Sequence, residues 1–171
     1  MAVEIGEQAP DFELEDQHGT PVKLSGFRGS KNVVLVFYPL AFSPVCGNEL
    51  CAMRDQFPEI PRDDVFPEVS GDEVVSEASR DDVELLTVSV DSTYAHRAWS
   101  DAEDFGFRLL SDFWPHGAVA KSYGVFDEDM GVATRGTFII DKAGVVRWKV
   151  VNPILQERDI SDYQKALADL D

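Results

Sequence analysis

The chain has 171 residues, 44% of them hydrophobic, so it is long and apolar enough to fold around a core rather than stay disordered. Its net charge of −17 argues against nucleic acids and anionic membrane surfaces as partners, and leaves open whether the host is adapted to salt. No apolar run reaches the roughly 18 residues that cross a membrane, and no basic-then-apolar leader opens the chain, so we expect a cytoplasmic protein.

The N-terminal residues are expected to form a β-hairpin. Apolar and charged residues alternate at 12–15 and again at 22–24, with Gln17-His18-Gly19 between them. The next apolar run, 33–38, is rich in β-branched and aromatic residues, which is typical of a strand buried on both faces of a largely parallel sheet. Pro39 ends this strand.

A helix is expected to begin at Ser43-Pro44, because serine can cap the first turn and proline needs no N–H at the first helical position. Leu50, Met53 and Phe57 continue it at helical spacing. The segment 58–80 is rich in proline and acidic residues without sustained periodicity, so we expect an exposed insertion. Whether it is only a solvated loop, contacts a neighbouring subunit or covers the site stays open.

The remainder of the chain reads as further strands and helices. Residues 84–90 indicate a buried strand, and Asp91-Ser92 can cap a helix over 93–104. We also expect a strand at 107–110, a short helix at 118–123 closed by Gly124, a hairpin of 134–140 with 145–151, and a last helix at 161–170. This order predicts one α/β domain over 1–171, with helices flanking a mixed central sheet, and it matches the thioredoxin-like architecture with an N-terminal extension.

Cys46 falls in the first turn of the helix predicted after Ser43-Pro44. Unpaired N–H groups and the positive end of the helix dipole favour an anion there, and the anion of cysteine is the thiolate. The position alone also allows a small, buried and unreactive cysteine.

The residues around this cysteine resemble the peroxiredoxin family. Pro39, Ser43 and Cys46 match its Pro-x-x-x-Thr/Ser-x-x-Cys active-site motif, and Glu49 follows three residues after the cysteine, as it often does in that family. The resemblance covers nearly the whole chain apart from a segment after Phe57, and it implies a thioredoxin-like fold and a thiol-dependent peroxidase without metal, haem or flavin.

Three other stretches strengthen the resemblance. Ala-Pro-Asp-Phe at 9–12 and Arg-Gly-Thr-Phe at 135–138 are similar to peroxiredoxin sequence. The residues at 37–43, together with Ser-Asp-Phe-Trp-Pro-His-Gly at 111–117, look most like the AhpE-type subgroup.

The resemblance implies a role for each matched residue. Cys46 would attack a peroxide oxygen as a thiolate, at a place that peroxide can reach, and become a sulfenic acid. Pro39 would shield the sulfur, and the Ser43 hydroxyl would bond the sulfur and the peroxide. Arg135 would stabilise the thiolate and the charge that develops as the O–O bond breaks, while Glu49 would orient Arg135.

Cys51 is the second of two cysteines. Five residues apart on one helix, Cys46 and Cys51 have Cα atoms about 8 to 9 Å apart, beyond the roughly 7 Å that a disulfide allows. The spacing resembles the peroxiredoxin Q type, in which the second cysteine resolves the sulfenic acid after local unfolding, whereas AhpE-type relatives are commonly treated as one-cysteine enzymes. We favour an intramolecular disulfide over an inert Cys51, and this requires the first helical turn to unwind.

Other chemistries have weaker support in the sequence. A hydrolase that pairs Cys46 with His116 lacks any local motif. His18, His96 and His116 have no metal-ligand spacing and are expected at the surface or as caps. No nucleotide-binding motif occurs, so no cofactor is expected.

The functional alternatives are a redox sensor or chaperone switched by Cys46 oxidation, and a thioredoxin-like disulfide reductase. For the peroxidase, the expected substrates are hydrogen peroxide and organic hydroperoxides, and the thiol reductant could be thioredoxin, a glutaredoxin-like protein or a small thiol. The resemblance further implies a homodimer or a higher homo-oligomer. Phe42 and Trp114 are candidates to line the entrance to the cysteine, to pack in the core or to form an interface.

Overall fold

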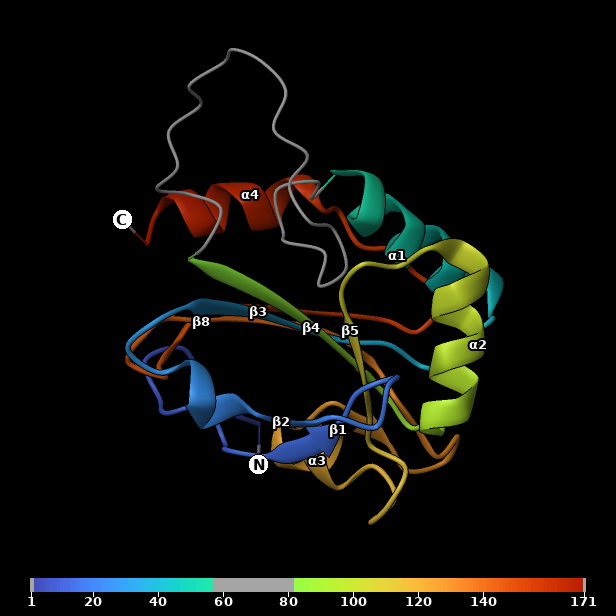
Figure 1. Cartoon of the computed structure of the whole chain (residues 1–171). Coiled ribbons are helices and arrows are strands. Elements are labelled where there is room, and N and C mark those ends of the chain that lie inside the picture. The colour runs from blue at the N-terminus through green and yellow to red at the C-terminus, as the bar shows by residue number, and fades with distance from the viewer. Residues whose placement is uncertain (1, 57–81, 171) are drawn as a thin grey trace.

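The computed structural model describes residues 2–56 and 82–170, and its centre is a five-stranded sheet of order β5-β4-β3-β8-β9 (Figure 1). The neighbours β3, β4 and β5 are parallel, whereas β8 pairs antiparallel with both β3 and β9. The sheet is therefore mixed, as the sequence predicts. Its strands are β3 (Asn32–Phe37), β4 (Val83–Ser89), β5 (Arg108–Ser111), β8 (Arg135–Ile140) and β9 (Val146–Asn152).

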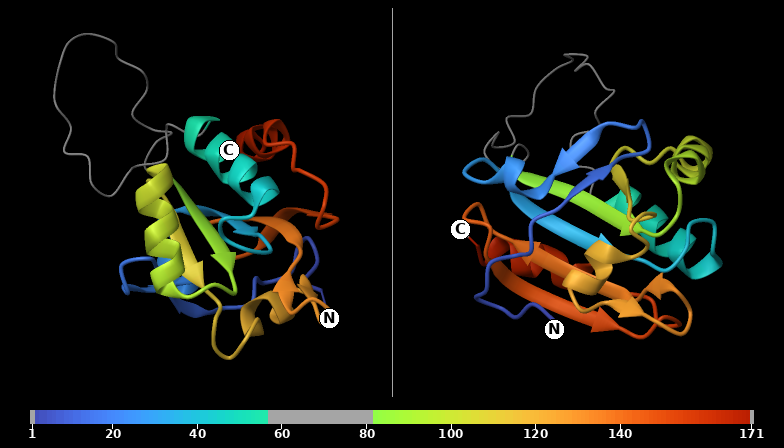
Figure 2. Two further views of the ribbon diagram at one scale, coloured as in Figure 1. Left: turned by 90° about the vertical axis from the view of Figure 1, so that its right-hand side faces the viewer. Right: turned by 90° about the horizontal axis from the view of Figure 1, so that it is seen from below.

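Helices cover one face of the sheet, and an N-terminal hairpin with a short helix covers the other. Figure 1 shows α1 (Pro44–Gln56) and α4 (Ser161–Ala168) above the sheet, and Figure 2 shows them lying next to each other. Helix α2 (Thr93–Glu103) packs into the same core through Trp99. The opposite face carries β1 (Glu13–Glu15), β2 (Pro21–Lys23), the 3-10 helix η1 (Leu24–Phe27) and α3 (Ala118–Ser122).

Strand β3 is the middle of the molecule. Val33 to Phe37 each have at most 2% of their surface exposed. Leu35 and Phe37 belong to the core under the N-terminal hairpin, while Val34 and Val36 belong to the core under α1. Burial on both faces explains why the sequence of this strand is a continuous apolar run rather than an alternating one.

The sheet register brings distant segments together at the end of β3. Val36 pairs with Thr137, and β8 runs antiparallel to β3, so Arg135 at the start of β8 lies beyond the last residues of β3. The chain leaves β3 at the same end, passes through Pro39 and enters α1 at Pro44. The start of α1 and the start of β8 therefore meet at one edge of the sheet.

The predicted elements are confirmed with small shifts at their ends. Ser92 caps α2, its hydroxyl accepting the Ala95 N–H at 3.2 Å. A two-stranded ribbon of β6 (Phe126–Asp127) and β7 (Val132–Ala133) was not predicted, because two residues per strand are too few to show alternation. The expected insertion at 58–80 and the helical position of Phe57 lie outside the described residues. None of the helices in the described ranges is long and apolar enough to cross a membrane.

Candidate active site

Cys46 lies in the first turn of α1, where the sequence predicts it. The helix starts at Pro44, and the Gly47 N–H donates to the Ser43 carbonyl at 2.8 Å. Cys46 has no exposed surface and packs in the core with Tyr38 and Trp99. The expectation that peroxide reaches the thiol directly is therefore not met in this conformation. Side chains from neighbouring elements cover the thiol, and local sequence does not reveal which elements will pack there.

A buried cluster of three charged side chains stands one helical turn from Cys46. Glu49, three residues after the cysteine on α1, accepts a hydrogen bond from Arg135 Nη1 at 3.0 Å. Its other partner is Arg158, whose Nε lies 3.2 Å from Glu49 Oε2 and whose backbone N–H donates to Oε1 at 3.1 Å. The side chains of Glu49, Arg135 and Arg158 are 1%, 3% and 0% exposed.

The two guanidinium groups are held by backbone and side-chain acceptors as well as by Glu49. Arg135 Nε donates to the carbonyl of Ile154. Arg158 donates through Nη2 to the carbonyl of Phe37, the last residue of β3, and through Nη1 to Thr137 Oγ1 at 3.3 Å. Arg158 is thus fixed against the end of the central strand from which the chain leads to Cys46, and Arg135 is held at the start of the neighbouring strand β8.

The charges in this cluster do not balance. Two guanidinium groups face one carboxylate, and in the described ranges no second carboxylate lies within 4.0 Å of either one. Desolvation lowers the pKa of Arg158, and the negative charges of Glu49 and Cys46 act in the opposite direction. A thiolate at Cys46 would therefore supply the negative charge that the cluster lacks.

Arg158 is the functional candidate that the sequence analysis missed. It lies in the segment between β9 and α4, with Glu157 and Asp159 on either side, both of them exposed. A run of charged residues of this kind predicts a solvated surface segment. No periodicity in the sequence distinguishes the buried Arg158 from its exposed neighbours. Only the fold, which returns this segment to the start of α1, reveals it.

Pro39 and Ser43 frame the segment that joins β3 to α1. Pro39 is buried, and Ser43 is half-buried immediately before the helix. Between them Phe42 has a left-handed backbone with φ of 64°, a conformation that bulky residues rarely adopt. Its ring is 58% exposed and lies 5.8 Å from the ring of Trp99, whereas Trp114 is 80% exposed, so neither residue is part of the core.

Cys51 is half-buried about one and a half turns along α1 from Cys46, and both cysteines are free thiols. Its Sγ donates to Glu103 Oε2, at the end of α2, over 3.5 Å. Desolvation raises the pKa of Cys51, and this hydrogen bond to a carboxylate raises it further. The structure therefore holds Cys51 as a protonated thiol and does not bring it to Cys46.

The histidines His116 and His96 differ in burial and lie in different parts of the fold. His116 is exposed and bonds the Gly131 carbonyl at 2.7 Å, on the opposite side of the sheet from the core that holds Cys46, so the geometry gives a cysteine-histidine pair no support. His96 is fully buried, which corrects the expectation of a surface position. Helix α2 packs it against β4, a contact that single-sequence periodicity does not show. Within the described ranges no three metal-ligating side chains cluster.

Comparisons with known proteins find relatives that cover most of the chain. The model of a family described as AhpC/TSA matches residues 5–73 and 69–149. Alkyl hydroperoxide reductase E of Mycobacterium tuberculosis is 42% identical over 166 residues, which cover 97% of each chain. A chloroplastic 2-Cys peroxiredoxin of Spinacia oleracea is 36% identical over 95% of this chain and 58% of its own length.

Solved structures give the same result. Peroxidoxin BcpB from Mycobacterium tuberculosis superposes with a TM-score of 0.73 at 32% identity, covering 98% of this chain and 96% of that one. AhpC of Enterococcus faecalis superposes with a TM-score of 0.79 at 28% identity, covering 99% and 93%.

Proposed function

Because this chain belongs to the AhpC/TSA family of peroxiredoxins and is a thiol-dependent peroxidase, we propose that Cys46 is its peroxidatic cysteine. The observation that supports this most strongly is the unbalanced charge cluster of Glu49, Arg135 and Arg158 beside the first turn of α1. An excess buried positive charge favours an anion, and the thiol of Cys46 is the neighbouring group that can become one. Stopped-flow measurement of peroxide consumption by the wild type and by Cys46→Ser tests this assignment.

The proposed reaction is a two-electron transfer. The Cys46 thiolate attacks one peroxide oxygen, a sulfur–oxygen bond forms, and the O–O bond breaks. The departing oxygen takes a proton and leaves as water or as an alcohol, while Cys46 is oxidised to the sulfenic acid. Arg135 stabilises charge on the oxygens, Glu49 orients Arg135, the Ser43 hydroxyl bonds the peroxide and Pro39 shields the sulfur. We propose hydrogen peroxide and organic hydroperoxides as substrates, and the name of the mycobacterial relative, alkyl hydroperoxide reductase E, supports the organic hydroperoxides.

Cys51 is proposed to resolve the sulfenic acid. The two cysteines share a helix of 13 residues, so the first turn must unwind before a disulfide can form. We expect peroxide to convert the protein to one intramolecular Cys46–Cys51 disulfide, detected by mass spectrometry of peroxide-treated protein. Cys51→Ser is the matched control and should stop at sulfenic or sulfinic Cys46. If the wild type also stops there with Cys51 free, Cys51 is not the resolving residue.

The rate of this second step should rise with pH. Cys51 attacks as a thiolate, and both desolvation and its hydrogen bond to Glu103 raise its pKa, so the protonated thiol predominates at neutral pH. We expect the rate of disulfide formation to rise with pH and to level off only above about pH 8.5, the ordinary pKa of cysteine. Glu103→Gln should accelerate it severalfold at neutral pH, because a neutral amide replaces the carboxylate.

Quenched time courses of disulfide formation across a pH series measure this effect. Asp55→Asn removes another nearby carboxylate charge that raises the pKa of Cys51 but does not accept the thiol hydrogen bond, so it measures how much of the effect is charge alone. Equal rates for Glu103→Gln and the wild type at neutral pH would show that Glu103 does not restrain Cys51.

The peroxidase needs a thiol reductant, and we propose that it also assembles with further copies of itself. The reductant is a thiol, and we propose thioredoxin, a glutaredoxin-like protein or a small thiol for this role.

We also propose a homodimer or higher homo-oligomer, because large exposed apolar side chains follow the parallel strands at one edge of the sheet, where a second copy could cover them. They are Leu40, Phe42, Tyr94, Phe113 and Trp114. We propose the cytoplasm as the location, a reducing compartment in which the cysteines of a thiol peroxidase can be returned to the thiol form.

A further inference from the structure

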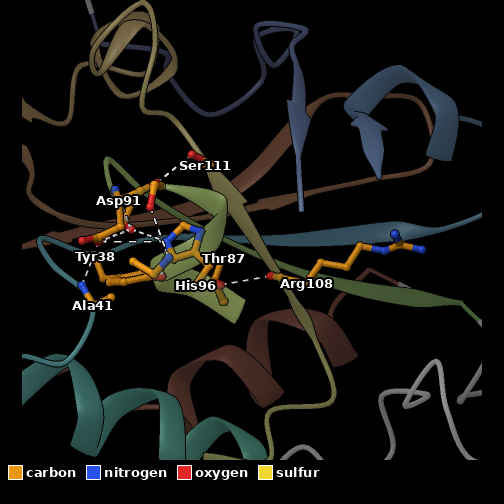
Figure 3. Close-up of polar contacts among 10 residues, drawn as sticks. Tyr38, Ala41, Thr87, Asp91, His96, Arg108 and Ser111 are labelled. Carbon is orange, nitrogen blue, oxygen red and sulfur yellow. Dashed lines mark hydrogen bonds and ion pairs between the residues drawn. The ribbon is translucent and has the colours of Figure 1, made fainter. Parts of the chain in front are cut away.

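His96 is the centre of a buried hydrogen-bond network that the peroxidase reaction described above does not use. Its Nε2 lies 2.6 Å from Ser89 Oγ and 3.1 Å from the Tyr38 hydroxyl, and the side chain has no exposed surface. Figure 3 shows His96, Tyr38 and Asp91 converging, with Ala41 at the edge of the group. Tyr38 directly precedes Pro39, so the network reaches the segment that leads to Cys46.

Asp91 extends the network to the other side of the same segment. One of its oxygens, Oδ2, accepts the Ser89 hydroxyl at 2.6 Å and the Ala41 N–H at 2.8 Å. Its backbone carbonyl in turn accepts the Ser111 hydroxyl at 2.6 Å, which ties this residue to β5. Hydrogen bonds from β4, β5 and α2 therefore hold Tyr38 and Ala41 at the same time.

The segment held in this way needs external support. Phe42, the residue after Ala41, has its backbone in the left-handed region, which surrounding contacts must maintain for a bulky side chain. Phe42 is itself 58% exposed and so contributes little packing of its own. The hydrogen bond from Ala41 to Asp91 is the adjacent contact that can fix it.

The network also lies within electrostatic range of the thiol. Burial raises the pKa of Tyr38, and the charges of Asp91 and Cys46 raise it further. Tyr38 and Cys46 are both fully buried in one core. Burial lowers the pKa of His96 to about 4 against the opposing charge of Asp91, so His96 is neutral near pH 7 and acts through hydrogen bonds.

We propose that His96 is a positioning residue of the peroxidase, which with Ser89 and Asp91 forms a brace that fixes residues 38–42 so that Pro39 and Ser43 are placed correctly around Cys46. This inference rests on the proposed function of Cys46. Pro39 and Ser43 are the groups proposed to shield the sulfur and to bond the peroxide, and displacement of such groups by about 1 Å can slow a reaction by about a hundredfold.

Loss of the brace should slow the reaction of Cys46 with peroxide without impairing formation of its thiolate, whereas a general loss of structure would impair both. The charge cluster of Glu49, Arg135 and Arg158 makes no hydrogen bond to the brace within the described ranges, so the thiolate should form equally well without His96. Peroxide reduction needs the placed groups as well as the thiolate. Alkylation of the thiol by iodoacetamide needs only the thiolate and access.

The experiment therefore compares these two reactions in several variants. His96→Phe keeps a ring but removes both hydrogen bonds, and we expect it to slow peroxide oxidation of Cys46 by about ten- to a hundredfold. Alkylation should stay at or above the wild-type rate, because displacement of the shielding Pro39 opens access to the sulfur. His96→Gln, which can still bond Ser89 and Tyr38, should recover most of the peroxide rate. Ser100→Ala removes another buried hydrogen bond of α2, from Ser100 Oγ to the Phe105 carbonyl, and should leave both rates unchanged.

If His96→Phe does not fold, Ser89→Ala provides the same comparison, because it removes the hydroxyl that joins His96 to Asp91, and it should also slow peroxide oxidation selectively. The inference is wrong if the folded brace variants react with peroxide as fast as the wild type, or if peroxide oxidation and alkylation slow by the same factor. A wild-type Cys46 that fails to react with peroxide would overturn the proposed function as well, so the two failures are distinguished by the wild-type trace.

Discussion

Replacing Cys46 with serine is expected to abolish peroxide consumption, lowering the rate by at least about 10³-fold. The serine hydroxyl has nearly the same size as the thiol but is not ionised near neutral pH, so the proposed nucleophile is lost with little change in packing. Stopped-flow traces of peroxide added to the wild type and to the variant, with a thiol donor present, measure the effect. Equal rates would remove Cys46 from the reaction.

The second cysteine supplies the matched control for this experiment. Cys51→Ser should leave the first peroxide reaction at the wild-type rate, because Cys51 bonds Glu103 and not Cys46. A single turnover in Cys51→Ser, followed by arrest at oxidised Cys46, would separate the peroxide step from the resolving step. Loss of the first turnover in Cys51→Ser but not in Cys46→Ser would reverse the two roles.

Local sequence predicts well those parts of the site that depend on neighbouring residues. The strand before Pro39 is recognisable because burial on both faces demands an unbroken apolar run. The first turn of α1 is recognisable because Pro44 suits that position, and this places Cys46 correctly. The ion pair between Glu49 and Arg135 agrees with the orientation that the family resemblance implies, and the catalytic roles of both residues remain predictions.

The parts that local sequence could not predict depend on contacts between distant segments. Arg158 lies 109 residues from Glu49 and becomes part of the cluster only because the chain returns to the start of α1 after β9. His96 is 58 residues from Tyr38, and its helix shows no pattern that distinguishes a buried polar side chain from a surface one. The complete burial of Cys46 also results from packing between α1, α2 and the sheet.

The charge cluster connects these observations to the chemistry. Buried ion pairs seldom stabilise a fold more than apolar side chains of similar volume would, because desolvation offsets the attraction. A carboxylate with two buried guanidinium groups is therefore poorly explained by stability alone. It is well explained if the cluster holds positive charge beside a thiol that reacts as an anion, as we propose for Cys46.

Glu49→Ala is expected to destabilise the protein by about 3 to 5 kcal/mol, because removal of the shared carboxylate leaves two buried guanidinium groups without their partner. Urea unfolding measures the loss as a lower midpoint at an unchanged slope. Glu157→Ala removes a carboxylate that bonds Asn48 at the surface and should change stability by no more than about 0.5 kcal/mol. Similar unfolding midpoints for the two variants would show that Glu49 does not compensate the buried arginines.

Glu49→Ala should also distinguish the positive charge that favours the Cys46 thiolate from the orientation of Arg135 that peroxide reduction needs. With Glu49 gone, the positive charge beside the first turn of α1 increases, so the thiolate is favoured at least as strongly as in the wild type. Arg135 loses the 3.0 Å hydrogen bond that fixes its Nη1, so peroxide reduction should fall although alkylation by iodoacetamide does not. A parallel fall in both rates would mean that Glu49 supports only the fold, and an unchanged peroxide rate would mean that Arg135 needs no orientation from Glu49.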